Sequence, residues 1–223
     1  MRGAGARIAA RLERGNPPVT PASKETGRIE AFSDGVFAIA ITLLILDIKV
    51  PRASESSVGL GTLLLRQWPA YVAFLASFAK IGIMWINHHR LFTHIVRSSH
   101  ALLLLNSLLL LGIVVVPFPT ALVAEYFGHE GEHLAATLFS GTFLLIAIIF
   151  NVLWRYASKH LLGHNASVPE VREISKQYRF GPLFYVLCLL LVPFSVGASI
   201  GMNLALAIFF ALPPAWVQRS SRA

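Results

Sequence analysis

The stretch that decides the fold is residues 28–50, which read RIEAFSDGVFAIAITLLILDIKV. It opens with charged residues, passes a polar Phe32-Ser33-Asp34 step, and is apolar from Gly35 onward. A helix rises about 1.5 Å per residue, so this stretch is long enough to cross a bilayer. Asp34 lies just inside the apolar part, where a charge is costly. We therefore expect this carboxylate to have a partner or a task.

The composition is that of an integral membrane protein. Of the 223 residues, 55% are hydrophobic and only 13% are charged, and the mean hydropathy is +0.64. A soluble domain has about 25% charged residues. The net charge of +8 would also suit a nucleic-acid-binding protein, but the apolar spans favour basic loops on the cytoplasmic side of a membrane. The single cysteine, Cys188, lies in an apolar run and cannot form a disulfide within the chain.

The lengths of the apolar segments predict an all-α integral membrane protein with six transmembrane helices. The spans are expected at about 28–49, 69–90, 100–123, 133–157, 179–195 and 198–216. The loop at about 158–178 has helix-start signals at Ser167, Pro169 and Glu170, which suggest a short interfacial helix there. The expected domain organisation is a flexible cytoplasmic N-terminal tail at 1–27, a six-helix transmembrane domain at 28–217 and a cytoplasmic C-terminal tail at 218–223.

The basic residues alternate between loops, and this alternation predicts the orientation. The N-terminal tail, the second and fourth loops and the C-terminal tail carry most of the lysines and arginines. The third loop has no basic residue and contains Glu125, Glu130 and Glu132. Since positive loops stay in the cytoplasm, six spans with both termini inside fit this pattern.

A helical wheel of the first span separates an apolar face from Asp34. At about 100° per residue, the residues that share one face are Phe32, Ile39, Thr42, Leu43 and Leu46. Asp34 lies about 140° away from Ile39 on the same wheel. The apolar face could serve ordinary helix packing or lipid contact, or it could line a pore, and periodicity alone does not separate these interpretations.

Polar residues of the second and third spans should lie at the depth of Asp34. With the interfacial Arg28, the candidate partners are Trp85, Asn87, His88 and Asn106. A hydrogen-bonded cluster would satisfy the buried carboxylate, and we favour a packing network over a proton relay. Lys80, the other charge inside a span, could extend to the interface or pair with Asp34.

Four histidines raise the hypothesis of a metal enzyme: His88, His89, His94 and His100. Their spacing, HHRLFTH over the first three, lacks the glutamate of the common zinc pattern. Gly-rich phosphate loops, nucleophile elbows and carbonyl-lined filter motifs are also missing from the sequence. We therefore expect no enzyme activity, no cofactor and no bound metal.

Three motifs resemble the signatures of the transmembrane protein 175 family, the lysosomal potassium channels and their prokaryotic relatives. The first is Arg28-x-x-x-Phe32-Ser33-Asp34 with the apolar residues that follow it. The second is Trp85-x-x-His88-His89-x-x-Phe92, and the third is Asn106 followed by Pro117-Phe118. The motifs cover the first half of the chain, and the second half matches in span number.

The resemblance implies a homotetrameric, potassium-preferring cation channel in a prokaryotic plasma membrane, with the first helix of each subunit lining a central pore. It implies that Ile39 forms the narrowest constriction and that Thr42, Leu43 and Leu46 lie further along the pore. Arg28, Phe32, Ser33 and Asp34 would position this helix, together with a group from the next spans: Trp85, Asn87, His88, His89 and Asn106. Protons and sodium are alternative permeant ions.

The residues leave one further interpretation open. A proton-coupled secondary transporter could use the intramembrane groups of Asp34, Lys80 and His88. Against it, the sequence has no pair of repeats with broken helices at matching positions.

Overall fold

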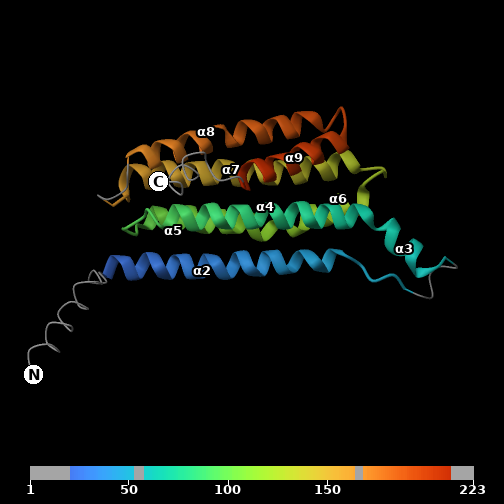
Figure 1. The fold of residues 1–223 in the computed structure, drawn as a ribbon, viewed down its shortest axis with the longest axis horizontal. Helices are drawn as coiled ribbons and strands as arrows, with labels where there is room; N and C mark the ends of the chain where they lie inside the picture. Colours follow the sequence, from blue (N-terminus) through green and yellow to red (C-terminus); the bar gives the residue numbers. More distant parts are fainter. Residues whose placement is uncertain (1–20, 53–57, 164–167, 212–223) are drawn as a thin grey trace, which may run out of the picture.

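The computed structural model describes residues 21–52, 58–163 and 168–211, which form a bundle of α-helices (Figure 1). The elements are α2 (Pro21–Leu43), the 3-10 helix η1 (Leu44–Asp47), α3 (Leu60–Arg66), α4 (Trp68–Phe92), α5 (His100–Val115), α6 (Pro117–Tyr126), α7 (Glu132–His160), α8 (Val168–Leu191) and α9 (Val196–Ala211). The predicted C-terminal tail and most of the predicted N-terminal tail lie outside the described residues.

Four segments of the described chain are long and apolar enough to cross a bilayer: Glu25–Asp47, Trp68–Phe92, His100–Tyr126 and Glu132–His160. A shorter apolar helix covers Val196–Ile208. The first part of α8 carries the exposed charges of Arg172, Lys176 and Arg179, so its apolar part is shorter than the helix. The chain is thus a multi-pass integral membrane protein with an all-helical fold.

A helix is present where the sequence predicted a short interfacial one, but it is continuous with the fifth span and not separate from it. α8 runs without interruption from Val168 to Leu191. Its buried residues recur every three or four positions from Ile174 onward: Ile174, Tyr178, Gly181, Tyr185 and Cys188. This single buried face packs on α7, so the two predicted pieces are held as one helix. Ser167, part of the predicted start signal, lies outside the described residues.

A proline step, Pro117-Phe118-Pro119, lies inside the third predicted span. α6 continues the chain helically past this step to Tyr126. Pro117 has no N–H to donate, and the Val116 N–H bonds to the carbonyl of Ile113 at 3.2 Å. The step therefore divides α5 from α6 without ending the span, because a proline is tolerated in the first turn of a helix.

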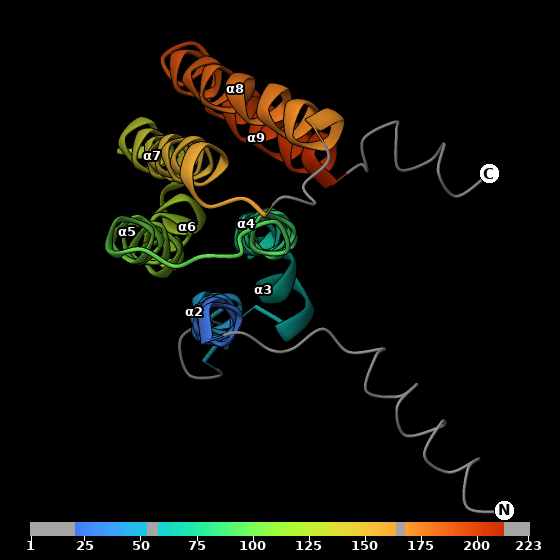
Figure 2. The same cartoon turned by 90° about the vertical axis from the view of Figure 1, so that its left-hand side faces the viewer.

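Helix α7 is central in the bundle, and α2 lies at its edge. α7 packs against α5, α6, α8 and α9, whereas α2 packs mainly against α4 and α5. Seen along the helices, α2 is on the opposite side of the bundle from α8 and α9 (Figure 2). One side of α2 is therefore left uncovered by the described residues of the chain.

Candidate functional site

The uncovered side of α2 carries the residues that the helical wheel grouped together. Ile39 is 60% exposed and Leu46 is 71% exposed. Phe32, Thr42 and Leu43 are exposed as well. Leu46 belongs to η1, which continues α2, and we call these five residues the exposed face of α2. The face is apolar apart from one hydroxyl, and a membrane protein can cover such a face with lipid, with another subunit or with the lumen of a pore.

The opposite side of α2 is packed into the bundle. Phe37 and Ala40 are almost completely buried there, as is Leu44 at the start of η1. The Thr42 hydroxyl, on the exposed face, donates a hydrogen bond to the Ile39 carbonyl of its own helix at 2.8 Å. One side of α2 is thus fixed by packing in the bundle. The described residues leave the other side exposed, so lipid, another subunit or the lumen of a pore can cover it.

A buried hydrogen-bond chain joins α2 to α5 and α4. The Asn106 amide donates to the Ser33 hydroxyl at 2.9 Å, and Ser33 donates to the Ile29 carbonyl at 2.9 Å. His88 Nε2 lies 2.8 Å from Asn106 Oδ1. Because this amide oxygen only accepts, His88 Nε2 is the donor. These hydrogen bonds order three helices. Because the Asn106 amide does not titrate, they do not form a continuous path for a proton.

Packing of the His88 ring adds to this contact. The ring stacks on Phe92, with centroids 4.4 Å apart, and meets Phe37 of α2 at 5.4 Å. His88 and Ser33 are fully buried, and Asn106 is nearly so. His88 Nδ1 has no partner among the described residues, but in a low-dielectric interior the buried bond of Nε2 to Asn106 fixes the relative rotation and height of the helices that share it.

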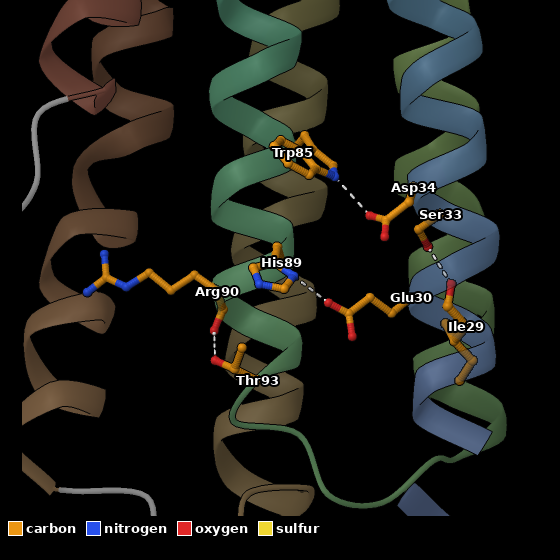
Figure 3. A network of polar contacts seen from close by, with 8 residues as sticks. All are labelled: Ile29, Glu30, Ser33, Asp34, Trp85, His89, Arg90 and Thr93. Atoms are coloured by element: carbon orange, nitrogen blue, oxygen red, sulfur yellow. Dashed lines mark hydrogen bonds and ion pairs between the residues drawn. The ribbon is translucent and has the colours of Figure 1, made fainter. Parts of the chain in front are cut away.

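Two further contacts join α2 to α4 near the same end (Figure 3). The Trp85 indole N–H donates to Asp34 Oδ1 at 2.8 Å. One turn away, Glu30 Oε1 lies 2.6 Å from His89 Nδ1. Arg90 points away from α2 in the same view. Glu30 was missed in the sequence, although its position four residues before Asp34 places both carboxylates on the same side of the helix.

Three residues predicted for the positioning group lie elsewhere. Asn87 is buried on another side of α4, where its side-chain oxygen is 3.4 Å from the Tyr178 hydroxyl of α8. Arg28 is exposed and forms no hydrogen bond or ion pair with any described residue. Phe32 belongs to the exposed face of α2, 67% of it being uncovered. Of the predicted group, the contacts to α2 come from Trp85, His88, His89 and Asn106.

Lys80 does not pair with Asp34, which corrects the sequence-based suggestion. Its side chain is 1% exposed and points into the other half of the bundle, where Nζ donates to Asn203 Oδ1 at 2.5 Å. The amino group also lies 3.6 Å from the ring centroid of Phe143. The sequence did not identify Asn203 as the partner of Lys80, because the two residues lie on helices more than a hundred residues apart in the chain.

The Lys80 contact belongs to a second polar network. Asn203 Nδ2 donates to Ser140 Oγ and to the Ser199 carbonyl, both at 3.0 Å, and Ser199 Oγ donates to the Cys188 carbonyl at 2.7 Å. These bonds join α4, α7, α8 and α9. Asp34, His88 and Lys80 therefore belong to three separate sets of contacts, and the hydrogen bonds among the described residues do not link one set to another.

Metal ligands do not gather anywhere in the described part of the chain. No group of three or more His, Cys, Asp or Glu side chains within it could hold a metal ion. His94 and His100 lie in and after the loop between α4 and α5, apart from the contact of His89 with Glu30. The candidate site is thus an apolar surface on a positioned helix.

Known proteins resemble this chain in sequence and in fold. Residues 28–117 match the family model described as the endosomal/lysosomal potassium channel TMEM175. A potassium channel of Chamaesiphon minutus is 53% identical over 195 residues, covering 86% of this chain and 96% of that channel. A potassium channel of Streptomyces collinus is 42% identical over 189 residues, covering 83% of this chain and 91% of that channel.

A solved structure agrees with these sequence matches. The crystal structure of a lysosomal potassium-selective channel TMEM175 homologue from Chamaesiphon minutus superposes with a TM-score of 0.79 at 52% identity. The match covers 84% of this chain and 97% of the solved one. The similarity therefore extends past the motifs of the first half, into α7, α8 and α9.

Proposed function

The chain belongs to the TMEM175 family of ion channels, and from this we propose that it is a potassium-preferring cation channel of a prokaryotic plasma membrane. The relatives that it matches over most of their length are named potassium channels. The family is a class of channels and not of enzymes. The proposed cargo is potassium, with sodium and protons as the ions to be tested against it.

The proposed assembly is a homotetramer of six-span subunits with both termini in the cytoplasm. The observation that carries it is the division of α2 into a packed side and the exposed face of α2. Four residues of this face are proposed to line the lumen: Ile39, Thr42, Leu43 and Leu46. Four copies of this face around one axis would cover their apolar surface and enclose a lumen. The described residues of one chain leave this face uncovered, so assembly would complete the site.

Ile39 is proposed to form the narrowest point of this lumen. A ring of four such side chains makes an apolar constriction, which can exclude ions because water leaves so narrow an apolar passage. A β-branched side chain has few rotamers, so opening would come mainly from movement of the helices apart. The contacts at Ser33, Asp34 and Glu30 would set the orientation of the helix that moves.

Discrimination between potassium and sodium should be modest. Without a ring of fixed carbonyls to replace the hydration shell, selectivity depends on the cost of dehydration at the constriction. Thr42 can add to it, since its hydroxyl proton is engaged with the Ile39 carbonyl and its oxygen lone pairs remain able to face a cation.

The test is cation flux into proteoliposomes that contain purified wild-type protein or Ile39→Asn. A polar ring should remove the apolar barrier, and a reduction of about 1.4 kcal/mol in that barrier would raise flux about tenfold. We expect higher potassium flux and a lower ratio of potassium to sodium flux. The matched control is Ile148→Asn, the same change at an exposed position of α7, which should alter neither quantity.

Assembly is measured on the same preparations by size-exclusion chromatography with light scattering. An Ile39→Asn tetramer with wild-type flux and selectivity would show that α2 does not form the constriction. A monodisperse monomer that still conducts would contradict the tetrameric pore.

A further inference from the structure

The exposed side of α7 changes from apolar to basic at one end. Leu145, Ile148 and Val152 are exposed along the helix, and Arg155 and Lys159 continue the same side in its last turns. The spacing of three and four residues keeps all five on one strip. A strip of this kind has a hydrocarbon-facing part and a part that lies at the level of lipid headgroups.

Helix α5 repeats this arrangement next to α7. Leu104, Leu108 and Leu111 are exposed along α5, and His100 and Arg97 are exposed at its beginning. α5 and α7 pack against each other, and the loop before α5 is bonded to the end of α7. The basic ends of both strips therefore lie at the same end of the bundle.

Specific bonds hold these two ends together. The hydroxyl oxygens of Ser99 and Tyr156 are 3.0 Å apart, and the Val96 N–H donates to the Leu161 carbonyl at 3.1 Å. The His160 ring stacks on Tyr156 with centroids 4.9 Å apart. The loop before α5 and the end of α7 are thus joined from both backbone and side chains. Four basic residues lie on these joined segments, and we call them the basic corner: Arg97, His100, Arg155 and Lys159.

The charge of the basic corner is not compensated within the described chain. Arg97, Arg155 and Lys159 form no ion pair with any described residue. The carboxylates of Glu30 and Asp34 on α2 are bonded to His89 and Trp85. An anion from outside the chain is the natural partner for such a cluster.

We propose that the basic corner binds the headgroup of an anionic phospholipid, whose acyl chains lie along the exposed leucines of α5 and α7. Arginine and lysine both bind phosphate oxygens through charge-assisted hydrogen bonds, and basic sites between transmembrane helices select anionic headgroups. The apolar strips that lead to the corner favour a lipid over a free anion. The site rests on the proposed placement of α5 and α7 across the bilayer, but it does not depend on ion conduction.

The test is native mass spectrometry of the purified full-length protein with added dioleoyl phosphatidylglycerol or dioleoyl phosphatidylcholine. We expect wild type to retain phosphatidylglycerol in preference to phosphatidylcholine. The variant Arg97→Gln/Lys159→Gln should bind phosphatidylglycerol about 30-fold more weakly, since each cation near an anionic lipid contributes about fivefold. Arg97→Lys/Lys159→Arg keeps both charges and should bind within a few-fold of wild type.

The matched control is Arg172→Gln/Arg179→Gln, which removes two exposed cations from α8. This pair should leave the preference for phosphatidylglycerol in place. Equal losses in the two glutamine pairs would mean general attraction to positive charge and would overturn the site. Equal binding of the two lipids by wild type, or release of bound phosphatidylglycerol by millimolar inorganic phosphate, would overturn it too. Lipid binding is measured separately from the potassium flux of the proteoliposome test. A protein that binds phosphatidylglycerol in the first assay but conducts no potassium in the second would refute only the proposed function.

Discussion

Single residues of α2 act on opposite sides of the helix. Ser33 and Asp34 are bonded to Asn106 and Trp85, whereas Ile39 and Leu46 are exposed. A carboxylate inside a span suggests an ion-binding or proton-carrying group. Here the bond to Trp85 gives Asp34 a structural partner. Apart from Thr42, the residues proposed to meet the ion are apolar, and Ser33 and Asp34 hold the helix that carries them in place.

Asn106 is the residue whose loss should disturb α2 most. Asn106→Ala removes the partner of His88 and a donor to Ser33 in one change. Interhelical hydrogen bonds in membranes contribute about 0.6 kcal/mol on average, but an unsatisfied buried group costs about 1–3 kcal/mol. His88 Nδ1 already has no partner among the described residues, so we expect the larger value.

The measurement is the thermal unfolding midpoint of the detergent-solubilised protein, with assembly followed by light scattering. Ser107→Ala is the control, because Ser107 is the next residue of α5 and is exposed. It should leave the midpoint unchanged. Equal midpoints for the two variants would contradict the assigned role of Asn106.

At the scale of elements, the position of α2 depends on how closely its neighbours pack. α2 rests on α4 and α5, and α5 rests on α7. Gly112 of α5 lies at a close approach of α5 to α7: a Cβ there would lie 2.8 Å from Ile146 Cγ1. The absence of a side chain at Gly112 therefore sets the spacing of the helices that support α2.

Gly112→Ala should lower the free energy of unfolding despite the better helix propensity of alanine. Overpacking costs about 1–3 kcal/mol, against a propensity gain of up to about 1 kcal/mol. Gly141→Ala is the matched control in α7, where an added Cβ meets nothing within 4 Å. In the double variant Gly112→Ala/Ile146→Ala the clash is gone, so its loss in thermal midpoint should be smaller than the sum of the single losses. Strict additivity would argue against close approach at Gly112.

At the scale of the whole molecule, two polar networks serve different halves of the bundle. One joins α2 to α4 and α5 through Ser33, Asn106 and His88. The other joins α4 to α7, α8 and α9 around Lys80 and Asn203. α4 belongs to both, so it connects the helix proposed to line the pore with the rest of the subunit.

Replacement of the two partners of the second network should have unequal effects. Lys80→Met puts an unbranched apolar chain among Phe139, Phe143 and Tyr185, and we expect assembly and flux to persist because Lys80 is remote from the exposed face of α2. Asn203→Leu leaves the Lys80 amino group without its acceptor, which should cost about 1.5–3 kcal/mol. Thermal unfolding and potassium flux are measured for both. An assembled Lys80→Met protein without flux would favour a transport mechanism that uses this amine.

Some of this protein follows from the sequence alone. Hydrophobic length identified four segments long enough to cross a bilayer, and the helical period separated Ile39 from Asp34, since both are properties of a single helix. The motifs at Arg28, Trp85 and Asn106 indicated the family, which the comparisons confirmed. The roles of Ile39 and of the other residues proposed for the pore stay predictions.

The tertiary structure alone decided which polar groups meet. It paired Lys80 with Asn203 instead of Asp34, joined Glu30 to His89 and made α8 one helix. These outcomes depend on the rotation and height at which one helix docks on another. The periodicity of a helix shows which of its sides is apolar, but it contains no information about the side chain that will face it at the same depth on a neighbour.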